Sequence, residues 1–236
     1  GCPVDKVTKD GSGSGMLKNP DLIGEMLANM IAAVKIPVTV KIRAGWDEQS
    51  INAPLITQIA ERVGAKAITI HGRTRAQGYK GPANWDYIKA CKQVAKSIQV
   101  IGNGDVFDAD AALRMFAHTG CDAVLVSRGT LGRPWIVEDI LRAMDGLPPI
   151  HRTPLDVRDT LLEHFYLIIR YRNEKQSLLD FRRVGCWYLK QLEGVKELRI
   201  GLNRAQTSAE ALRLIEYFPW QDVSLSQALA FAESEA

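Results

Sequence analysis

Residues 67–75 read AITIHGRTR, a short run of apolar and β-branched residues that ends in a histidine, a glycine and two arginines. Runs of the same kind occur three more times, at 38–42 (VTVKI), 98–101 (IQVI) and 123–126 (AVLV). This composition is typical of strands that are buried on both faces. The sequence therefore predicts four such strands.

Segments with helical spacing of their apolar residues separate the expected strands, at 53–63, 85–95 and 109–118. Gly64 and Gly120 follow two of these segments, where a left-handed residue commonly ends a helix. Buried strands that alternate with helices predict an α/β fold with a parallel sheet covered by helices.

Polar side chains stand at or just past the carboxyl ends of the expected strands, at Lys41, His71, Asn103 and Arg128. In a (β/α)8 barrel, this is the face on which the active site is built. A doubly wound sheet also binds ligands at these ends, but it normally has a glycine-rich dinucleotide turn after an early strand. No GxGxxG motif follows an expected strand, which favours the barrel.

Two of these strand ends continue into glycine-containing turns, NGD at 103–105 and SRG at 127–129. Glycine lets backbone amides approach an anion closely, and a helix that begins soon afterwards adds its positive end. A single Gly-Asp pair after a strand is most often only a turn and a helix cap. Four polar strand ends in series favour a site that holds a phosphate.

The composition of the 236 residues, 46% hydrophobic and 24% charged, predicts one large domain, or one domain with a small appendage. A net charge of +3 is too small to indicate nucleic-acid binding by itself. The four cysteines show no paired metal spacing, and the sequence contains neither a signal peptide nor a long apolar run. We therefore expect a reduced, cytoplasmic protein without a metal or a membrane contact.

The charge is concentrated at 170–204, where nine basic residues and four acidic residues occur around Trp187 and Tyr188. A basic, aromatic helical surface suits an RNA backbone. An amphipathic helix explains the run about as well, with its basic residues in solvent and Trp187 and Leu189 in the core.

Prolines at 148, 149 and 154 mark a linker between the barrel part and this basic region. The segments 155–171 and 207–217 have the spacing of helices in a small bundle. We expect the last residues, 230–236 (AFAESEA), to fray.

Several long motifs resemble those of the tRNA-dihydrouridine synthases, bacterial B-type subgroup, and they occur in the same order over nearly the whole chain. They are GCPVDKV with the following GSGSG, PVTVKIRAGW, ITIHGRTRAQGYKG, IGNGDV, SRGTLGRPWI and FRRVGCWYLKQLEGVKELRIGLNRAQT. The resemblance implies the C-terminal half of a TIM (β/α)8 barrel, followed by a small all-α helical domain. The FMN-binding barrel portion, strands five to eight, would span 1–147, and the tRNA-binding helical domain would span 153–236. The chain would then be a fragment that begins after the fourth strand.

The activity that the resemblance implies is the flavin-dependent reduction of uridine to 5,6-dihydrouridine in tRNA, by a monomer that uses FMN with NADPH or NADH as the reductant. In the family, the cysteine of GCP donates the proton, and this residue is Cys2 here. The reduction needs a hydride at one carbon and a proton at its neighbour, which a thiol on an exposed loop can supply. For Cys91, Cys121 and Cys186, we expect the role of a small buried hydrophobe instead.

The resemblance also implies the residues that hold the cofactor and the RNA. Lys41 would contact the flavin, and His71 would lie beside the cofactor. The phosphate end would be formed by Asn103, Gly104, Asp105, Ser127 and Arg128, with Ser127 where glycine is commoner. The expected RNA-binding residues are Arg73, Arg182, Arg183 and Lys190. Without the motif, the more common interpretation of Lys41 is a lysine that extends into solvent from a strand end. Arg73 could equally well be an ion-paired loop residue. The residues Val184, Gly185 and Cys186 replace the family's histidine-containing basic pattern before WYLK.

Two other functions remain open. One is a different FMN-dependent barrel that reduces a small pyrimidine, which the GCP loop and the basic helical region argue against. The other is a non-catalytic RNA-binding fragment. Flavin absorbance of the purified chain distinguishes the RNA-binding fragment from the two enzymes. Comparing activity on tRNA with activity on free uracil distinguishes the two enzymes from each other.

Overall fold

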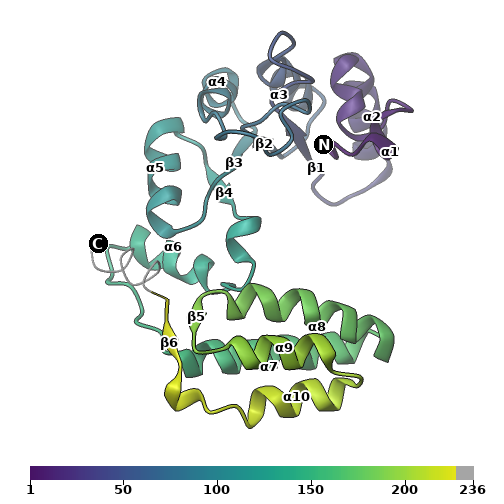
Figure 1. Ribbon diagram of the computed structural model, residues 1–236. Coiled ribbons are helices and arrows are strands. Elements are labelled where there is room, and N and C mark those ends of the chain that lie inside the picture. The colour runs from purple at the N-terminus through teal and green to yellow at the C-terminus, as the bar shows by residue number, and fades with distance from the viewer. Residues whose placement is uncertain (227–236) are drawn as a thin grey trace. The chain divides into compact units, whose positions relative to one another are not determined.

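The computed structural model describes residues 1–226, and the chain divides into two compact units, Gly1–Gly129 and Thr130–Ala236 (Figure 1). The predicted fraying of 230–236 and the end of the predicted helical domain lie outside the described residues. No helix within 1–226 is long and apolar enough to cross a membrane.

The first unit contains a four-stranded sheet in which the strands follow one another in sequence order and all pairs are parallel (Figure 1). The strands are β1 (Thr39–Arg43), β2 (Ala67–His71), β3 (Gln99–Asn103) and β4 (Ala123–Leu125). The helices between them are α3 (Ala53–Arg62), α4 (Asp86–Val94) and α5 (Ala109–Thr119). The expected α/β fold with a parallel sheet is confirmed, with element bounds that differ from the prediction by a few residues.

The register of the sheet aligns the carboxyl ends of its strands. Arg43 pairs with His71, His71 with Asn103, and Asn103 with Leu125. The four residues thus form one row across the sheet, because parallel strands that are in phase end at the same edge. The turns that follow these strands therefore lie together at that edge.

Glycines end two of the helices as the sequence predicts. Gly120 is the C-cap of α5 with φ 68°, and Gly64 follows α3 with φ 97°. At the other end of α5, the side chain of Asp108 accepts a hydrogen bond from the amide of Ala111 at 2.6 Å. Both ends of α5 are therefore defined by residues that the sequence shows.

A segment before the sheet contains three elements that the sequence analysis does not predict. They are α1 (Asp5–Thr8), the short 3₁₀ helix η1 (Gly13–Lys18) and α2 (Pro20–Ala33). Asn19 caps α2, and Gly24 brings α2 against α3, since a Cβ at Gly24 would lie 2.7 Å from Ile59. The Asn-Pro start signal is present in the sequence, but exposed apolar residues such as Leu22 and Met30 obscure the helical periodicity of α2.

The second unit is mainly helical (Figure 1). Its helices are α6 (Ile136–Met144), α7 (Pro154–Tyr171), α8 (Glu174–Leu189), α9 (Lys196–Arg204) and α10 (Ser208–Glu216), followed by η3 (Trp220–Asp222). A short antiparallel pair joins β5 (Leu192–Glu193) to β6 (Ser224–Leu225). The unit begins before α6, whereas the predicted domains leave a linker at 148–152, which lies between α6 and α7. The assignment of FMN to 1–147 and of tRNA to 153–236 stays a prediction.

The core of the second unit forms around two stacked rings. Phe165 of α7 and Phe181 of α8 are both fully buried, with ring centroids 3.7 Å apart. Tyr188 and Leu189 belong to the same core, whereas Trp187 is partly buried against it. The aromatic residues of the basic run are therefore divided between core and surface.

We predict that Phe165→Ala lowers the free energy of unfolding by about 3–5 kcal/mol, because it leaves a cavity against Phe181. Leu167→Ala, at an exposed position of the same helix, is the control and should change it by less than about 1 kcal/mol. Urea unfolding followed by circular dichroism measures both. Equal effects of the two substitutions would contradict the assignment of Phe165 to the core.

Candidate functional site

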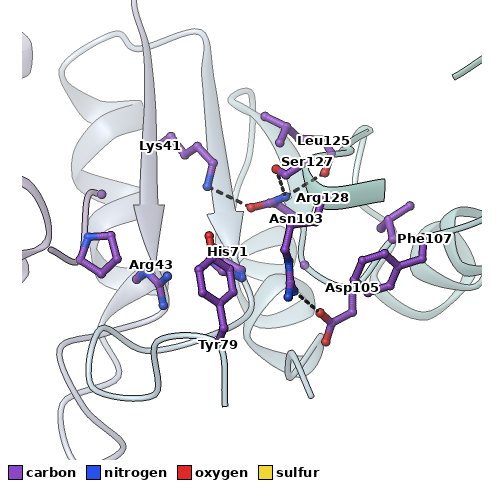
Figure 2. Close-up of a pocket in the computed structure, with 14 residues that line it drawn as sticks. Lys41, Arg43, His71, Tyr79, Asn103, Asp105, Phe107, Leu125, Ser127 and Arg128 are labelled. Atoms are coloured by element: carbon purple, nitrogen blue, oxygen red, sulfur yellow. Dashed lines mark hydrogen bonds and ion pairs between the residues drawn. The ribbon is translucent and has the colours of Figure 1, made fainter. Parts of the chain in front are cut away.

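The carboxyl edge of the sheet opens into a cleft with a volume of about 230 Å³ (Figure 2). Its wall is formed by the ends of all four strands and by the turns that follow them. The lining residues include Lys41, Arg43, His71, Tyr79, Asn103, Gly104, Asp105, Phe107, Ser127 and Arg128. The structure thus brings together every predicted cofactor residue, although none of their roles is tested by this placement.

Asn103 connects the first strand to the last one across this edge. Its Oδ1 accepts a hydrogen bond from Lys41 Nζ at 3.0 Å, and its Nδ2 donates to the carbonyl of Leu125 at 2.8 Å and to Ser127 Oγ at 3.3 Å (Figure 2). Burial, with a further contribution from Arg43, lowers the pKa of Lys41 from its usual value. Lys41 nevertheless is an exposed residue that lines the cleft, so its ammonium is open to solvent and to a ligand.

His71 is a neutral ring among cations. It is 7% exposed, and burial together with the charges of Arg43, Lys41 and Arg73 lowers its pKa to about 3. Arg73 Nη1 lies 3.4 Å from His71 Nε2. Since a guanidinium can only donate, Nε2 accepts this contact and the ring proton lies on Nδ1.

Asp105 organises the turn after β3. Its carboxylate accepts hydrogen bonds from Arg73 Nη2 at 2.6 Å, from Arg128 Nη2 at 2.9 Å and from the amide of Ala83 at 2.7 Å. Burial raises the pKa of Asp105, but the hydrogen bonds from Arg73 and Ala83 outweigh it and the pKa is lowered. The carboxylate thus stays ionised and fixes two arginines at one end of the cleft.

Two residues of this turn have left-handed backbone angles, Gly104 with φ 126° and Asp105 with φ 56°. A Cβ at Gly104 would lie 2.7 Å from the Cβ of Ala83 and 3.2 Å from the His71 ring. Glycine is therefore required at 104 for both conformation and space. The turn that the sequence identified as a candidate phosphate loop is closely packed against the strand ends.

The sequence analysis missed Arg43, Tyr79 and Phe107. Arg43 is buried and donates to the carbonyls of Thr74 at 2.7 Å and of Gly78 at 2.8 Å. The guanidinium of Arg128 lies 4.5 Å from the Tyr79 ring centre and 5.2 Å from that of Phe107. Position after a strand could have indicated Arg43, but no sequence signal shows that Tyr79 and Phe107 meet Arg128.

Cys2 lies on an exposed segment between Gly1 and Pro3, which both line the cleft. Ser14 fixes this segment, since its amide donates to the carbonyl of Cys2 at 2.9 Å and its Oγ donates to the carbonyl of Gly1 at 2.8 Å. Gly13 has φ 55°, and a Cβ there would lie 2.7 Å from the Cys2 carbonyl. The GSGSG stretch is therefore a close support for the backbone of Cys2.

The other cysteines lie elsewhere in the fold. Cys91 and Cys121 are buried, as expected, and burial raises the pKa of Cys91 to about 12. Cys186 is only half-buried.

The four expected RNA-binding residues differ in their surroundings. Arg73 is 3% exposed and ion-paired with Asp105, and the RNA contact expected of it stays a prediction. Arg182 is half-buried and donates to the carbonyl of Ala205 at 3.4 Å.

Arg183 and Lys190 are exposed at α8 and its C-cap. Arg183 pairs with Asp180 at 2.7 Å and lies 5.4 Å from the Trp187 ring centre. Arg183 and Lys190 therefore remain available as surface cations of the second unit.

A parallel sheet whose strands end at a cleft lined by lysine and arginine side chains defines an α/β protein with a cation-rich site at the carboxyl edge of its sheet. Residues 1–224 match the sequence model of the family described as Dihydrouridine synthase (Dus). The chain belongs to this family.

Three relatives show how much of a family member the chain represents. It is 39% identical over 221 residues to tRNA-dihydrouridine synthase B of Shewanella oneidensis, which covers 92% of this chain and 67% of that protein. The enzyme of the same name from Pseudomonas aeruginosa is 39% identical and is covered to 66%. The probable tRNA-dihydrouridine synthase 1 of Synechocystis is 38% identical and is covered to 61%. The chain thus spans about two thirds of the length of these relatives.

We predict that the His71 ring stays neutral from pH 5 to 8, because a pKa of about 3 lies far below its usual 6.5. The unfolded chain takes up a proton at this ring below about pH 6.5 that the folded chain does not. The contribution of His71 to stability is therefore complete above pH 6.5 and is lost as the pH falls toward 3. An NMR titration of the His71 ring carbons measures this, and a midpoint between pH 6 and 7 would contradict the burial of the ring among cations.

Proposed function

We propose that this chain takes part in the flavin-dependent reduction of uridine to 5,6-dihydrouridine in tRNA, with NADPH or NADH as the reductant. The names of its relatives give the reaction class. The observation that carries the proposal is the row of strand ends from Arg43 to Asn103, with Lys41 pointing into the cleft and the Cys2 segment beside it. The alternative is a non-catalytic fragment that only binds RNA.

The residues present fit FMN, which combines a phosphate with an electron-accepting ring system. Arg128 offers a cation at the end of the cleft where Gly104 allows close backbone approach. Asn103 and Ser127 add amide and hydroxyl groups. We assign the phosphate end to Asn103, Gly104, Asp105, Ser127 and Arg128, with Asp105 acting by orienting Arg128.

Lys41 and His71 would hold the ring system of FMN. The ammonium of Lys41, which lines the cleft, would stabilise the negative charge that a reduced flavin ring carries. His71 stays neutral, so it contributes a hydrogen-bonding ring without adding a further charge. When bound and reduced, FMN supplies the hydride that one carbon of the uracil double bond receives.

Cys2 would supply the proton for the neighbouring carbon. A proton donor must carry its proton until the transfer step, unlike a nucleophilic cysteine, which must lose it first. Ser14 and Gly13 hold the backbone of Cys2 in place, and the neighbours Gly1 and Pro3 line the cleft. Cys2 therefore sits on an exposed but supported segment beside the proposed cofactor site.

The tRNA would contact the second unit, where Arg183 and Lys190 are exposed. A basic helical surface with an aromatic ring beside it binds RNA backbone, and access to the uracil requires that the base leave its stack. We propose that the four-stranded sheet is the C-terminal half of a TIM barrel, since its strands are parallel and in sequence order.

The direct test incubates the chain with FMN, NADPH and tRNA that lacks dihydrouridine, and measures dihydrouridine by mass spectrometry of the digested tRNA. Free uracil is the parallel substrate. Formation of dihydrouridine in tRNA without reduction of free uracil supports the proposal. Reduction of free uracil at a comparable rate would favour a small-molecule reductase. RNA binding without bound flavin would favour the non-catalytic alternative.

Cys2→Ala should lower dihydrouridine formation by about 10²–10⁴-fold, because it removes the general acid. FMN affinity, measured by quenching of flavin fluorescence, should stay unchanged. Cys186→Ala, which removes the half-buried thiol of the second unit, is the control and should retain activity. Loss of FMN binding in Cys2→Ala would contradict the proton-donor role.

Lys41→Ala should weaken FMN binding by about tenfold or more, because it removes a positive charge that lines the cleft and the hydrogen bond to Asn103. Lys66→Ala removes an exposed lysine just before the amino end of β2 and serves as the control. Equilibrium dialysis with FMN compares the two variants. Equal affinities would show that Lys41 does not contact the cofactor.

A further inference from the structure

Arg75 is a residue of the loop after β2 that reaches the Cys2 segment. Its Nη2 donates to Asp5 Oδ1 and, at 3.3 Å, to Thr8 Oγ1, so it contacts both ends of α1. Its guanidinium also lies 4.6 Å from the ring centre of Trp46. The side chain is only 22% exposed, although its partner Asp5 is 91% exposed.

The loop that carries Arg75 is itself fixed to the loop after β1. The amide of Arg75 donates to the carbonyl of Gly45 at 2.9 Å, and the amide of Ala76 donates to the carbonyl of Trp46 at 2.8 Å. Arg75 thus starts from backbone that is tied to the strand ends of the sheet. Arg75 can therefore anchor residues 1–18, which precede β1 and contain no strand.

Further contacts complete the attachment of residues 1–18. Lys18 Nζ lies 3.8 Å from the centre of the same Trp46 ring, and Asn52 Nδ2 donates to the carbonyl of Leu17 at 2.7 Å. Gly15 packs against Thr8, since a Cβ there would lie 2.9 Å from the Thr8 carbonyl. The far end of the segment is therefore held by Lys18 and Asn52, and α1 by Arg75.

We propose that Arg75 is a positioning residue that holds α1, and through it Cys2, beside the cleft by means of its contacts with Asp5 and Thr8. The inference rests on the proposed function for the role of Cys2 but not for the attachment itself. Arg75 acts on the proton donor from a distance and is not a catalytic residue.

The geometry separates this role from a general contribution to stability. An ion pair with a partner as exposed as Asp5 adds little to global stability, because water screens the charges. Its effect is local, since α1 has only four residues and its inner contacts are few. Loss of Arg75 should therefore release α1 while the sheet stays folded.

The test compares Arg75→Ala with Lys6→Ala, which removes an exposed cation from α1 itself. Amide hydrogen exchange followed by mass spectrometry is expected to show at least about tenfold faster exchange within residues 4–15 in Arg75→Ala only, with unchanged exchange in the four strands. Asp5→Asn should give a change of the same kind. Unchanged exchange of residues 4–15 in both Arg75→Ala and Asp5→Asn would overturn the proposal.

Activity provides a second reading on the same variants. If Cys2 donates the proton, Arg75→Ala should lower kcat for tRNA by about 10- to 100-fold with FMN affinity unchanged, because a misplaced group loses its effective concentration. Arg75→Lys should recover part of kcat, since it restores the pair with Asp5. A rise in KM alone, shared by Lys6→Ala, would instead indicate a contact with RNA phosphate and overturn the positioning role. If exchange is faster in Arg75→Ala but the unaltered chain makes no dihydrouridine, the attachment is supported and the proposed function is contradicted.

Discussion

The parallel register of β1 to β4 is the constraint on which the site depends. Because the strands are in phase, Arg43, His71 and Asn103 end side by side, and the turns that follow them are forced together. A shift of one residue in any strand would turn these side chains to the opposite face. The cleft is therefore a direct consequence of strand pairing, and the loops add the rest of its lining.

The electrostatics of the cleft follow from this crowding. Asp105 pairs with Arg73 and Arg128, while the charges of Lys41, Arg43 and Arg73, together with burial, keep the His71 ring neutral. Asp105 pairs with two of the arginines and loop carbonyls accept from Arg43, whereas Lys41 is an exposed cation that lines the cleft and donates to Asn103. Positive charge at the carboxyl edge of a parallel sheet favours an anionic ligand.

The strand ends could be predicted from sequence because buried parallel strands are short apolar runs, and a polar residue marks where each run ends. Lys41, His71 and Asn103 are predicted in this way, and Gly120 indicates the C-terminal end of α5. The burial of Arg73 could not be read, because it depends on Asp105, which lies in a turn far along the chain. The contacts of Arg75 with Asp5 and of Arg128 with Tyr79 likewise join loops whose paths no local pattern specifies. The helix α2 escaped prediction because its apolar residues are not confined to one buried face.

The central claim is that the turns after β3 and β4 hold the phosphate of a flavin nucleotide. The most direct measurement is a calorimetric titration of the chain with FMN and, separately, with riboflavin, which has the same ring system but no phosphate. A phosphate held by Arg128 and by backbone amides near Gly104 predicts that FMN binds at least about tenfold more tightly than riboflavin. Equal affinities, or no binding of FMN, would contradict the claim.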